Sequence, residues 1–94
     1  MPISIAMQIQ GLELYSTGII DQSACRGEIT YDHTALIIGY GVENGREYWM
    51  LKNSWGTYWG EKGYMRILIT NDSIGVCGVN FYPIYPNFVW NIDI

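Results

Sequence analysis

The sequence predicts a mainly β domain in which most strands run antiparallel. Apolar and polar residues alternate with a period of two in the first segment, and an Asn44-Gly45 pair separates two runs rich in β-branched and aromatic residues. Eight Tyr, four Trp and two Phe also suit sheet faces, where a phenol oxygen can reach water or a backbone partner. The 94 residues allow one small domain, because domains usually contain about 100 to 150 residues.

Residues 3–10 form the first expected strand. The apolar side chains at positions 3, 5, 7 and 9 would share one face, and the residues between them would share the other, so this strand should be half-buried. Residues 12–15 are expected to form a short helical turn. Residues 19–20 begin an apolar stretch that leads into a polar loop.

A β-hairpin is expected in the middle of the chain. Residues 34–40 and 47–53 are its two strands, and residues 41–46 connect them. An Asn-Gly pair favours the tight turns of hairpins, because both residues tolerate a positive φ.

A third strand is expected at residues 63–70, and residues 71–73 have the composition of the turn that closes it. Pro83 and Pro86 make the last segment unsuitable as a central strand, because proline has no N–H to donate to a neighbouring strand.

The composition excludes several classes of partner. Hydrophobic residues make up 49% of the chain and charged residues 15%, which is typical of a folded domain. The net charge of −4 lacks the basic surface that nucleic acid requires, so no nucleic acid partner is expected. No apolar run approaches the ~20 residues that span a bilayer, so no membrane contact is expected either. Residues 1–15 contain no Lys or Arg and do not resemble a signal peptide.

The hairpin places the single histidine close to an asparagine. With the turn centred near Asn44, His33 comes within about two residues of facing Asn53 across the strands. An Asn amide oxygen can accept an imidazole N–H and so fix the tautomer and orientation of the ring, and Trp55 could shield that bond from water. On spacing alone, a structural histidine is the more common outcome.

Several segments together resemble the papain-like cysteine peptidases of the cathepsin type. They are Pro2 to Ala6, Asp32 to Gly41, Tyr48 to Gly56, Trp59 to Ile67 and Gly75 to Gly78. This resemblance implies the C-terminal, right-hand half of that fold, a twisted antiparallel β-barrel-like sheet. The resemblance covers most of residues 2–83. We expect residues 1–86 to form one half-domain and residues 87–94 to be a C-terminal extension of unknown role.

The resemblance also implies catalytic roles. His33 would be the imidazole that pairs with a cysteine thiolate and later protonates the leaving amine, and Asn53 would orient it. Trp55 would cover their contact as a supporting residue and line the primed side of the cleft. No cofactor is implied.

The cysteine that this chemistry needs is expected to lie outside the chain. The family motif places it about 130 to 150 residues before the histidine, but only 32 residues precede His33. We therefore expect the C-terminal portion of a cysteine endopeptidase, inactive alone, which acts on a peptide or protein substrate only with the missing left domain.

The resemblance assigns Cys25 and Cys77 to a disulfide, and such a bond indicates an oxidising compartment. The resemblance also implies a lysosomal or secreted protein. The bond would close a loop of about 50 residues and contribute about 4 kcal/mol. Cys25 lacks the surroundings that lower the pKa of a catalytic thiol. Two Cys and one His fall one ligand short of a structural zinc site, so no metal is expected.

A different class of function is a non-catalytic interaction module or truncated pseudo-peptidase. The absent domain would leave an apolar face bare, and that face could bind a protein partner. Exposed Ile and Trp side chains would favour this alternative.

Overall fold

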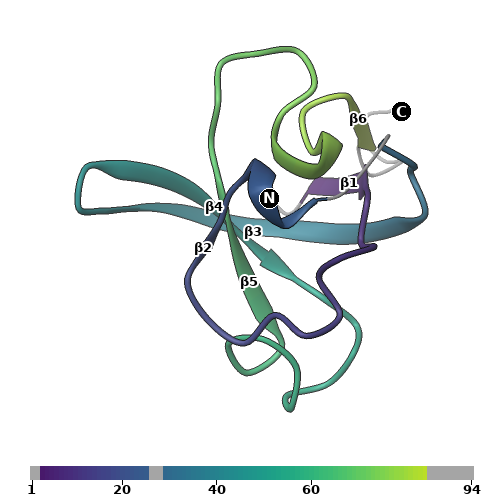
Figure 1. Ribbon diagram of the computed structural model, residues 1–94, viewed down its shortest axis with the longest axis vertical. Coiled ribbons are helices and arrows are strands. Elements are labelled where there is room, and N and C mark those ends of the chain that lie inside the picture. Colours follow the sequence, from purple (N-terminus) through teal and green to yellow (C-terminus); the bar gives the residue numbers. More distant parts are fainter. Residues whose placement is uncertain (1–2, 26–28, 85–94) are drawn as a thin grey trace.

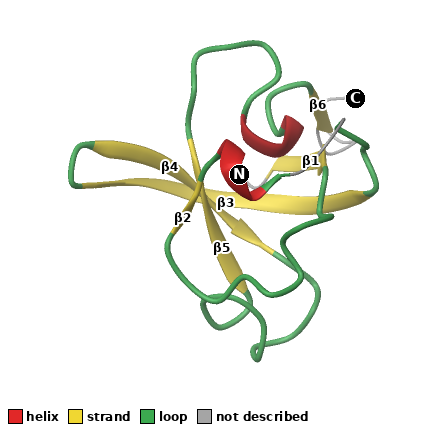
Figure 2. Ribbon diagram, viewed as in Figure 1, coloured by secondary structure: helices red, strands yellow, loops and turns green. Residues whose placement is uncertain are grey.

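The computed structural model describes residues 3–25 and 29–84. These residues form a six-stranded sheet with two short 3-10 helices, and long loops connect the strands (Figures 1 and 2). The elements, in chain order, are β1 (Ile3–Met7), β2 (Ile19–Ile20), η1 (Gln22–Ala24), β3 (His33–Glu43), β4 (Arg46–Lys52), β5 (Tyr64–Leu68), η2 (Val76–Gly78) and β6 (Tyr82–Ile84).

The sheet has the strand order β2-β5-β4-β3-β1-β6. Four of its five pairings are antiparallel, and the pairing of β2 with β5 is parallel. The predicted mainly β fold is therefore confirmed. Within the described residues the two edge strands, β2 and β6, do not pair with each other, so the sheet is open rather than closed into a barrel.

The predicted hairpin is formed by β3 and β4, whose turn projects well beyond the other strands (Figure 1). Asn44 and Gly45 occupy this turn with φ values of 53° and 78°, as expected for an Asn-Gly hairpin. A β-bulge at Ile38 shifts the register by one residue. On the open side of the bulge, Leu36 pairs with Lys52, which is the register that the sequence predicted.

Alternating side chains of the strands build the core. Ile5 and Met7 of β1, Leu51 of β4, and Met65 and Ile67 of β5 are almost completely buried. The alternation in β1 is the one that the sequence predicted for the first strand, and both β1 and β5 are shorter than the expected strands.

The prediction that Gln8 lies on the polar face of the first strand is wrong. The strand ends at Met7, and the Gln8 side chain is fully buried. The alternation stops there because the Gln8 backbone N–H donates to the carbonyl of Cys77 (2.9 Å) instead of to a strand. This hydrogen bond ties the end of β1 to η2.

A disulfide joins Cys25 and Cys77, with the two Cα atoms 5.6 Å apart, and both residues are buried. The pairing that the resemblance implied is therefore confirmed. Residues 12–15 form the expected turn, in which the Tyr15 N–H donates to the Leu12 carbonyl (3.1 Å).

Proline has the expected effect on the last segment, since Pro83 lies in β6 at an edge of the sheet. The predicted extension, residues 87–94, lies outside the described residues, as does Pro86. Among the helices that the structure describes, none is long and apolar enough to cross a membrane.

Candidate active site

The open end of the β3–β4 hairpin brings the two predicted catalytic residues together. His33 is the first residue of β3, and Asn53 directly follows the last residue of β4. The register at this end would place Asn53 opposite Ala35. His33 is two residues away from Ala35 and therefore points to the same face of the sheet.

A short hydrogen bond joins the two side chains. The Nε2 atom of His33 lies 2.7 Å from the Oδ1 atom of Asn53, and the backbone N–H of Ser54 donates to the same Oδ1 atom (2.8 Å). Because the Ser54 N–H donates a hydrogen bond to this atom, the atom is the amide oxygen, which can only accept hydrogen bonds. The Nε2 atom of His33 therefore carries the proton, and Nδ1 is the basic nitrogen that remains for chemistry.

Two tryptophan rings lie next to this pair. The ring centroid of Trp55 lies 5.5 Å from that of His33, and the rings of Trp55 and Trp59 pack edge to face with their centroids 5.3 Å apart. Asn53 is only 4% exposed, whereas Trp55 is 41% exposed. Trp55 is thus a partly exposed neighbour of the imidazole, and the burial of Asn53 strengthens the hydrogen bond by lowering the local dielectric.

The loop between β4 and β5 supports the site from behind. The backbone N–H of Asn53 donates to the Gly63 carbonyl (3.0 Å), and the N–H of Gly63 donates to the Trp59 carbonyl (2.7 Å). The indole Nε1–H of Trp59 donates to the Leu12 carbonyl (3.1 Å). This loop is therefore fixed at both the asparagine and the tryptophan.

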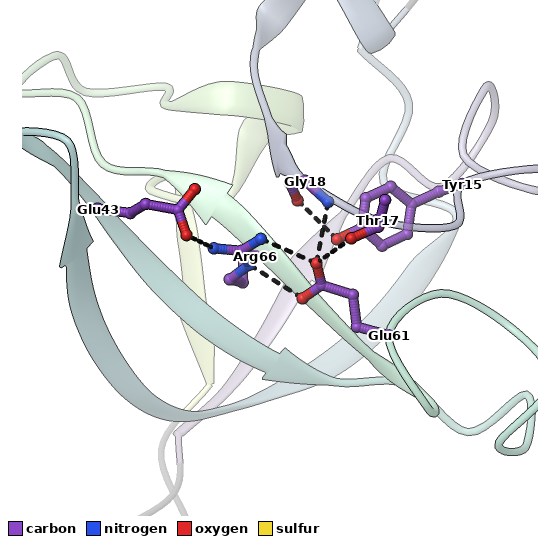
Figure 3. Close-up of polar contacts among 6 residues, drawn as sticks. All are labelled: Tyr15, Thr17, Gly18, Glu43, Glu61 and Arg66. Atoms are coloured by element: carbon purple, nitrogen blue, oxygen red, sulfur yellow. Dashed lines mark hydrogen bonds and ion pairs between the residues drawn. The ribbon is translucent and has the colours of Figure 1, made fainter.

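Sequence reasoning missed a charged cluster on the other side of this loop. The guanidinium of Arg66 contacts the carboxylates of Glu61 and Glu43 (Figure 3). Burial alone would raise the pKa of Glu61, but hydrogen bonds from Arg66, Gly18 and Thr17 together outweigh it and lower that pKa. A sequence signal was available, since Glu61 and Arg66 lie in the same segment of the family resemblance, but it did not indicate that they pair.

The described residues hold no group of three His, Cys, Asp or Glu side chains that could bind a metal ion. Both cysteines of the sequence are in the disulfide, so neither is a thiol. An open cavity of about 280 Å³ adjoins the site on the side of Leu36, Lys52 and Ser54.

Comparison with known proteins agrees with this geometry. A family model described as "Papain family cysteine protease" matches residues 1–87. The chain belongs to the papain family of cysteine proteases. It is 42% identical over 86 residues to the P34 probable thiol protease of Glycine max and 41% identical over 85 residues to a cathepsin L-like proteinase of Phaedon cochleariae.

The same papain-family fold is found among solved structures. The digestive procathepsin L 3 of Tenebrio molitor larval midgut superposes with a TM-score of 0.78 and 37% identity, covering 90% of this chain and 27% of that one. Each of the two relatives is matched over 90% of this chain, but the match spans only 23% and 25% of their own lengths. The matched segment is the C-terminal part of those proteins.

Proposed function

We propose that this chain supplies the histidine and asparagine of a papain-type endopeptidase site whose nucleophilic cysteine lies on another domain. The observation that carries the proposal is the hydrogen bond between His33 Nε2 and Asn53 Oδ1, because it leaves the Nδ1 atom of His33 as the basic nitrogen. Membership of the papain family of cysteine proteases supports the same assignment.

The proposed reaction uses His33 for both proton transfers. The imidazole takes the proton of the cysteine thiol at Nδ1, and the resulting thiolate attacks the peptide carbonyl and forms a C–S bond. The imidazolium then gives its proton to the leaving amine as the C–N bond breaks. In the second half, the imidazole removes a proton from water, and the hydroxide cleaves the thioester to release the acid and the thiol. Asn53 keeps the imidazole of His33 in one orientation throughout, and Trp55 shields the hydrogen bond between His33 and Asn53 from water.

The isolated chain is expected to be inactive. Its two cysteines are bonded to each other, so no thiolate is available to attack a peptide. Substrate contact on the opposite wall of a cleft must also come from the cysteine-bearing domain. We further propose that the protein works in the secretory pathway, in a lysosome or outside the cell, because the buried disulfide suits an oxidising compartment.

The test is to reconstitute the site. The 94-residue chain is mixed with, or fused after, the separately produced cysteine-bearing segment of the Phaedon cochleariae relative, and hydrolysis of a peptide amide is measured. We expect thiol-dependent hydrolysis that is lost in His33→Ala and strongly reduced in Asn53→Ala. Activity that survives in His33→Ala, or hydrolysis by the chain alone that thiol alkylation stops, would contradict the proposal.

An interaction module is a second candidate, supported by exposed apolar side chains on β3 between the bulge and the turn. Tyr40 and Val42 are exposed and lie on the same face of the hairpin as Trp49, because Tyr40 pairs with Trp49. We propose that they contact a protein partner, for which the cysteine-bearing domain is the first choice. The affinity for that domain, measured by calorimetry, should weaken at least ~10-fold in Tyr40→Ser/Val42→Ser. Unchanged affinity in this variant would exclude Tyr40 and Val42 from the interface.

A further inference from the structure

The charged cluster around Arg66 connects three parts of the chain (Figure 3). Arg66 of β5 forms a two-pronged contact with Glu61, from Nε to Oε1 and from Nη2 to Oε2, both at 2.9 Å. Its third donor, Nη1, reaches Oε1 of Glu43 at the end of β3 (2.7 Å). Paired Arg-carboxylate contacts of this kind fix geometry as well as charge.

Glu61 is the centre of the cluster. Besides Arg66, its Oε2 atom accepts hydrogen bonds from the Thr17 hydroxyl (2.8 Å) and the Gly18 backbone N–H (2.9 Å). Tyr15 adds to this corner by donating its hydroxyl hydrogen to the Gly18 carbonyl (2.7 Å). One carboxylate therefore holds the loop before β2 against β5.

The Arg66 side chain is held on its other side by an aromatic ring. Its guanidinium carbon lies 5.2 Å from the ring centroid of Tyr48, and the side chain is only 14% exposed. The Tyr48 ring lies against Gly41, where an added Cβ atom would come within 2.5 Å of the Tyr48 hydroxyl oxygen. The glycine thus leaves the space that lets Tyr48 cover Arg66.

Two chains of contacts lead from Glu61 to the candidate site. In the first, Glu61 and Tyr64 close a tight turn by two backbone hydrogen bonds of 2.9 and 3.2 Å. Gly63 lies inside this turn, and its carbonyl accepts the backbone N–H of Asn53 (3.0 Å). The position of Glu61 therefore sets the position of the group that holds the Asn53 backbone.

The second chain passes through the tryptophans. The Gly63 N–H donates to the Trp59 carbonyl, and the Trp59 ring packs on Trp55, which in turn contacts the imidazole of His33. The Gly60 N–H donates to the Tyr15 carbonyl (3.2 Å), so the corner held by Glu61 also fixes this part of the loop.

We propose that Arg66 is a positioning residue for the His33–Asn53 pair: by holding Glu61, it fixes the loop that carries the Trp55 cover and the Gly63 carbonyl. Arg66 touches neither the imidazole nor the amide and acts only through that loop. The functional importance of this inference rests on the proposed role of His33, but the geometry it describes is a property of this chain alone.

The test observes the imidazole directly by NMR of the isotope-labelled 94-residue chain. The Nε2–H proton of His33 gives a signal only while its exchange with water is slow. In Arg66→Met, which removes the charge and the donors, we expect this proton to exchange at least ~10-fold faster and the Trp55 indole signal to shift. Arg66→Lys keeps the charge without the two-pronged contact and should restore only part of the protection.

Glu43→Gln is the matched control, since it weakens the contact that Arg66 makes on the side away from the loop. It should leave the exchange of the His33 proton within about twofold of the wild type. If Arg66→Met does not fold, Glu61→Gln replaces it, and the same acceleration is expected. Wild-type protection in a folded Arg66→Met or Glu61→Gln variant would overturn the proposal, as would an equal acceleration in Glu43→Gln.

The result is independent of peptidase activity. A failed reconstitution with a cysteine-bearing domain would count against the proposed function but not against the positioning role. Conversely, reconstituted activity with an unaltered His33 proton in Arg66→Met would uphold the function and refute the positioning role.

Discussion

The two ends of the β3–β4 hairpin use polar side chains in different ways. At the open end, a 2.7 Å bond joins His33 and Asn53, Trp55 packs beside the imidazole, and Asn53 is almost fully buried. At the turn end, the 2.7 Å contact between Arg66 and Glu43 involves a carboxylate that is 52% exposed. The distances are equal, so the difference between the two ends lies in burial.

Burial determines what each contact contributes. A buried polar group left without a partner costs about 1 to 3 kcal/mol, because water cannot replace the lost bond. Exposed ion pairs contribute about 0 to 1 kcal/mol, because water and salt screen them. The open end should therefore be sensitive to single substitutions, and the turn end should tolerate them.

The largest effect is expected from the disulfide, which supports the open end. Replacing Cys25 and Cys77 by Ala should lower the free energy of unfolding by about 4 kcal/mol, because the bond closes a loop with a sequence separation of 52 residues. The Cys77 carbonyl also accepts the N–H of Gln8, the neighbour of Met7, which pairs with His33. Urea unfolding measures the loss, and a loss below about 1 kcal/mol would contradict this prediction.

Amide hydrogen exchange in the variant without the disulfide compares the two ends of the hairpin directly. The Gln8 and His33 amides should lose more protection than the amides next to the Asn44-Gly45 turn. Equal losses at both ends would show that the disulfide does not act selectively on the open end.

Asn53→Ala should lower the free energy of unfolding by about 1 to 3 kcal/mol. The substitution leaves two donors, the His33 Nε2–H and the Ser54 backbone N–H, without the acceptor that the buried Asn53 side chain provides. Ser54→Ala is the matched control, because it keeps that backbone N–H. Urea midpoints of both variants measure the difference, and a similar midpoint for both would count against a structural role for the buried bond.

The contribution of Glu61 to the free energy of unfolding should be lost only at low pH. The pKa of its carboxyl is lowered in the folded chain, so its contribution is complete above the ordinary value of about 4.5 and is lost as the pH falls through the lowered value. The difference in unfolding free energy between wild type and Glu61→Gln should stay constant from about pH 7 to 5 and shrink below about pH 4. A difference that already declines near pH 6 would contradict the lowered pKa.

The smallest effect is expected at the turn. Arg46 lies 4.0 Å from Asp21, and both side chains are about half exposed. Arg46→Gln should therefore change the free energy of unfolding by less than about 0.5 kcal/mol. Thermal unfolding at low and high salt measures this, and a loss as large as that of Asn53→Ala would remove the contrast between the two ends.

The sequence predicted the open end of the hairpin because its determinants are local. The Asn44-Gly45 turn aligns the strands that flank it, and the prediction that His33 comes within about two residues of facing Asn53 accommodates the one-residue shift at Ile38. Adding the family resemblance identified the disulfide as well, although Cys25 and Cys77 are far apart in the sequence.

The charged cluster could not be predicted in this way because it depends on contacts between segments that are far apart in the sequence. The pairing of β3 with β4 and of β4 with β5 places Glu43 and Arg66 on one face of the sheet. Glu61 also accepts hydrogen bonds from Thr17 and Gly18, which are 44 and 43 residues away in the sequence. Neither the bulge nor the parallel pairing of β2 with β5 leaves a signal in the alternation of apolar residues.

The tautomer of His33 tests the central claim most directly, and nitrogen-15 NMR of the imidazole measures it. When the ring is neutral, we predict that Nε2 carries the proton and donates it in a hydrogen bond to the Asn53 amide oxygen. We also predict an unprotonated Nδ1 whose chemical shift responds to Asn53→Ala. A neutral ring protonated on Nδ1, or one that exchanges freely between both forms, would show that Asn53 does not hold the imidazole for a cysteine and would contradict the account.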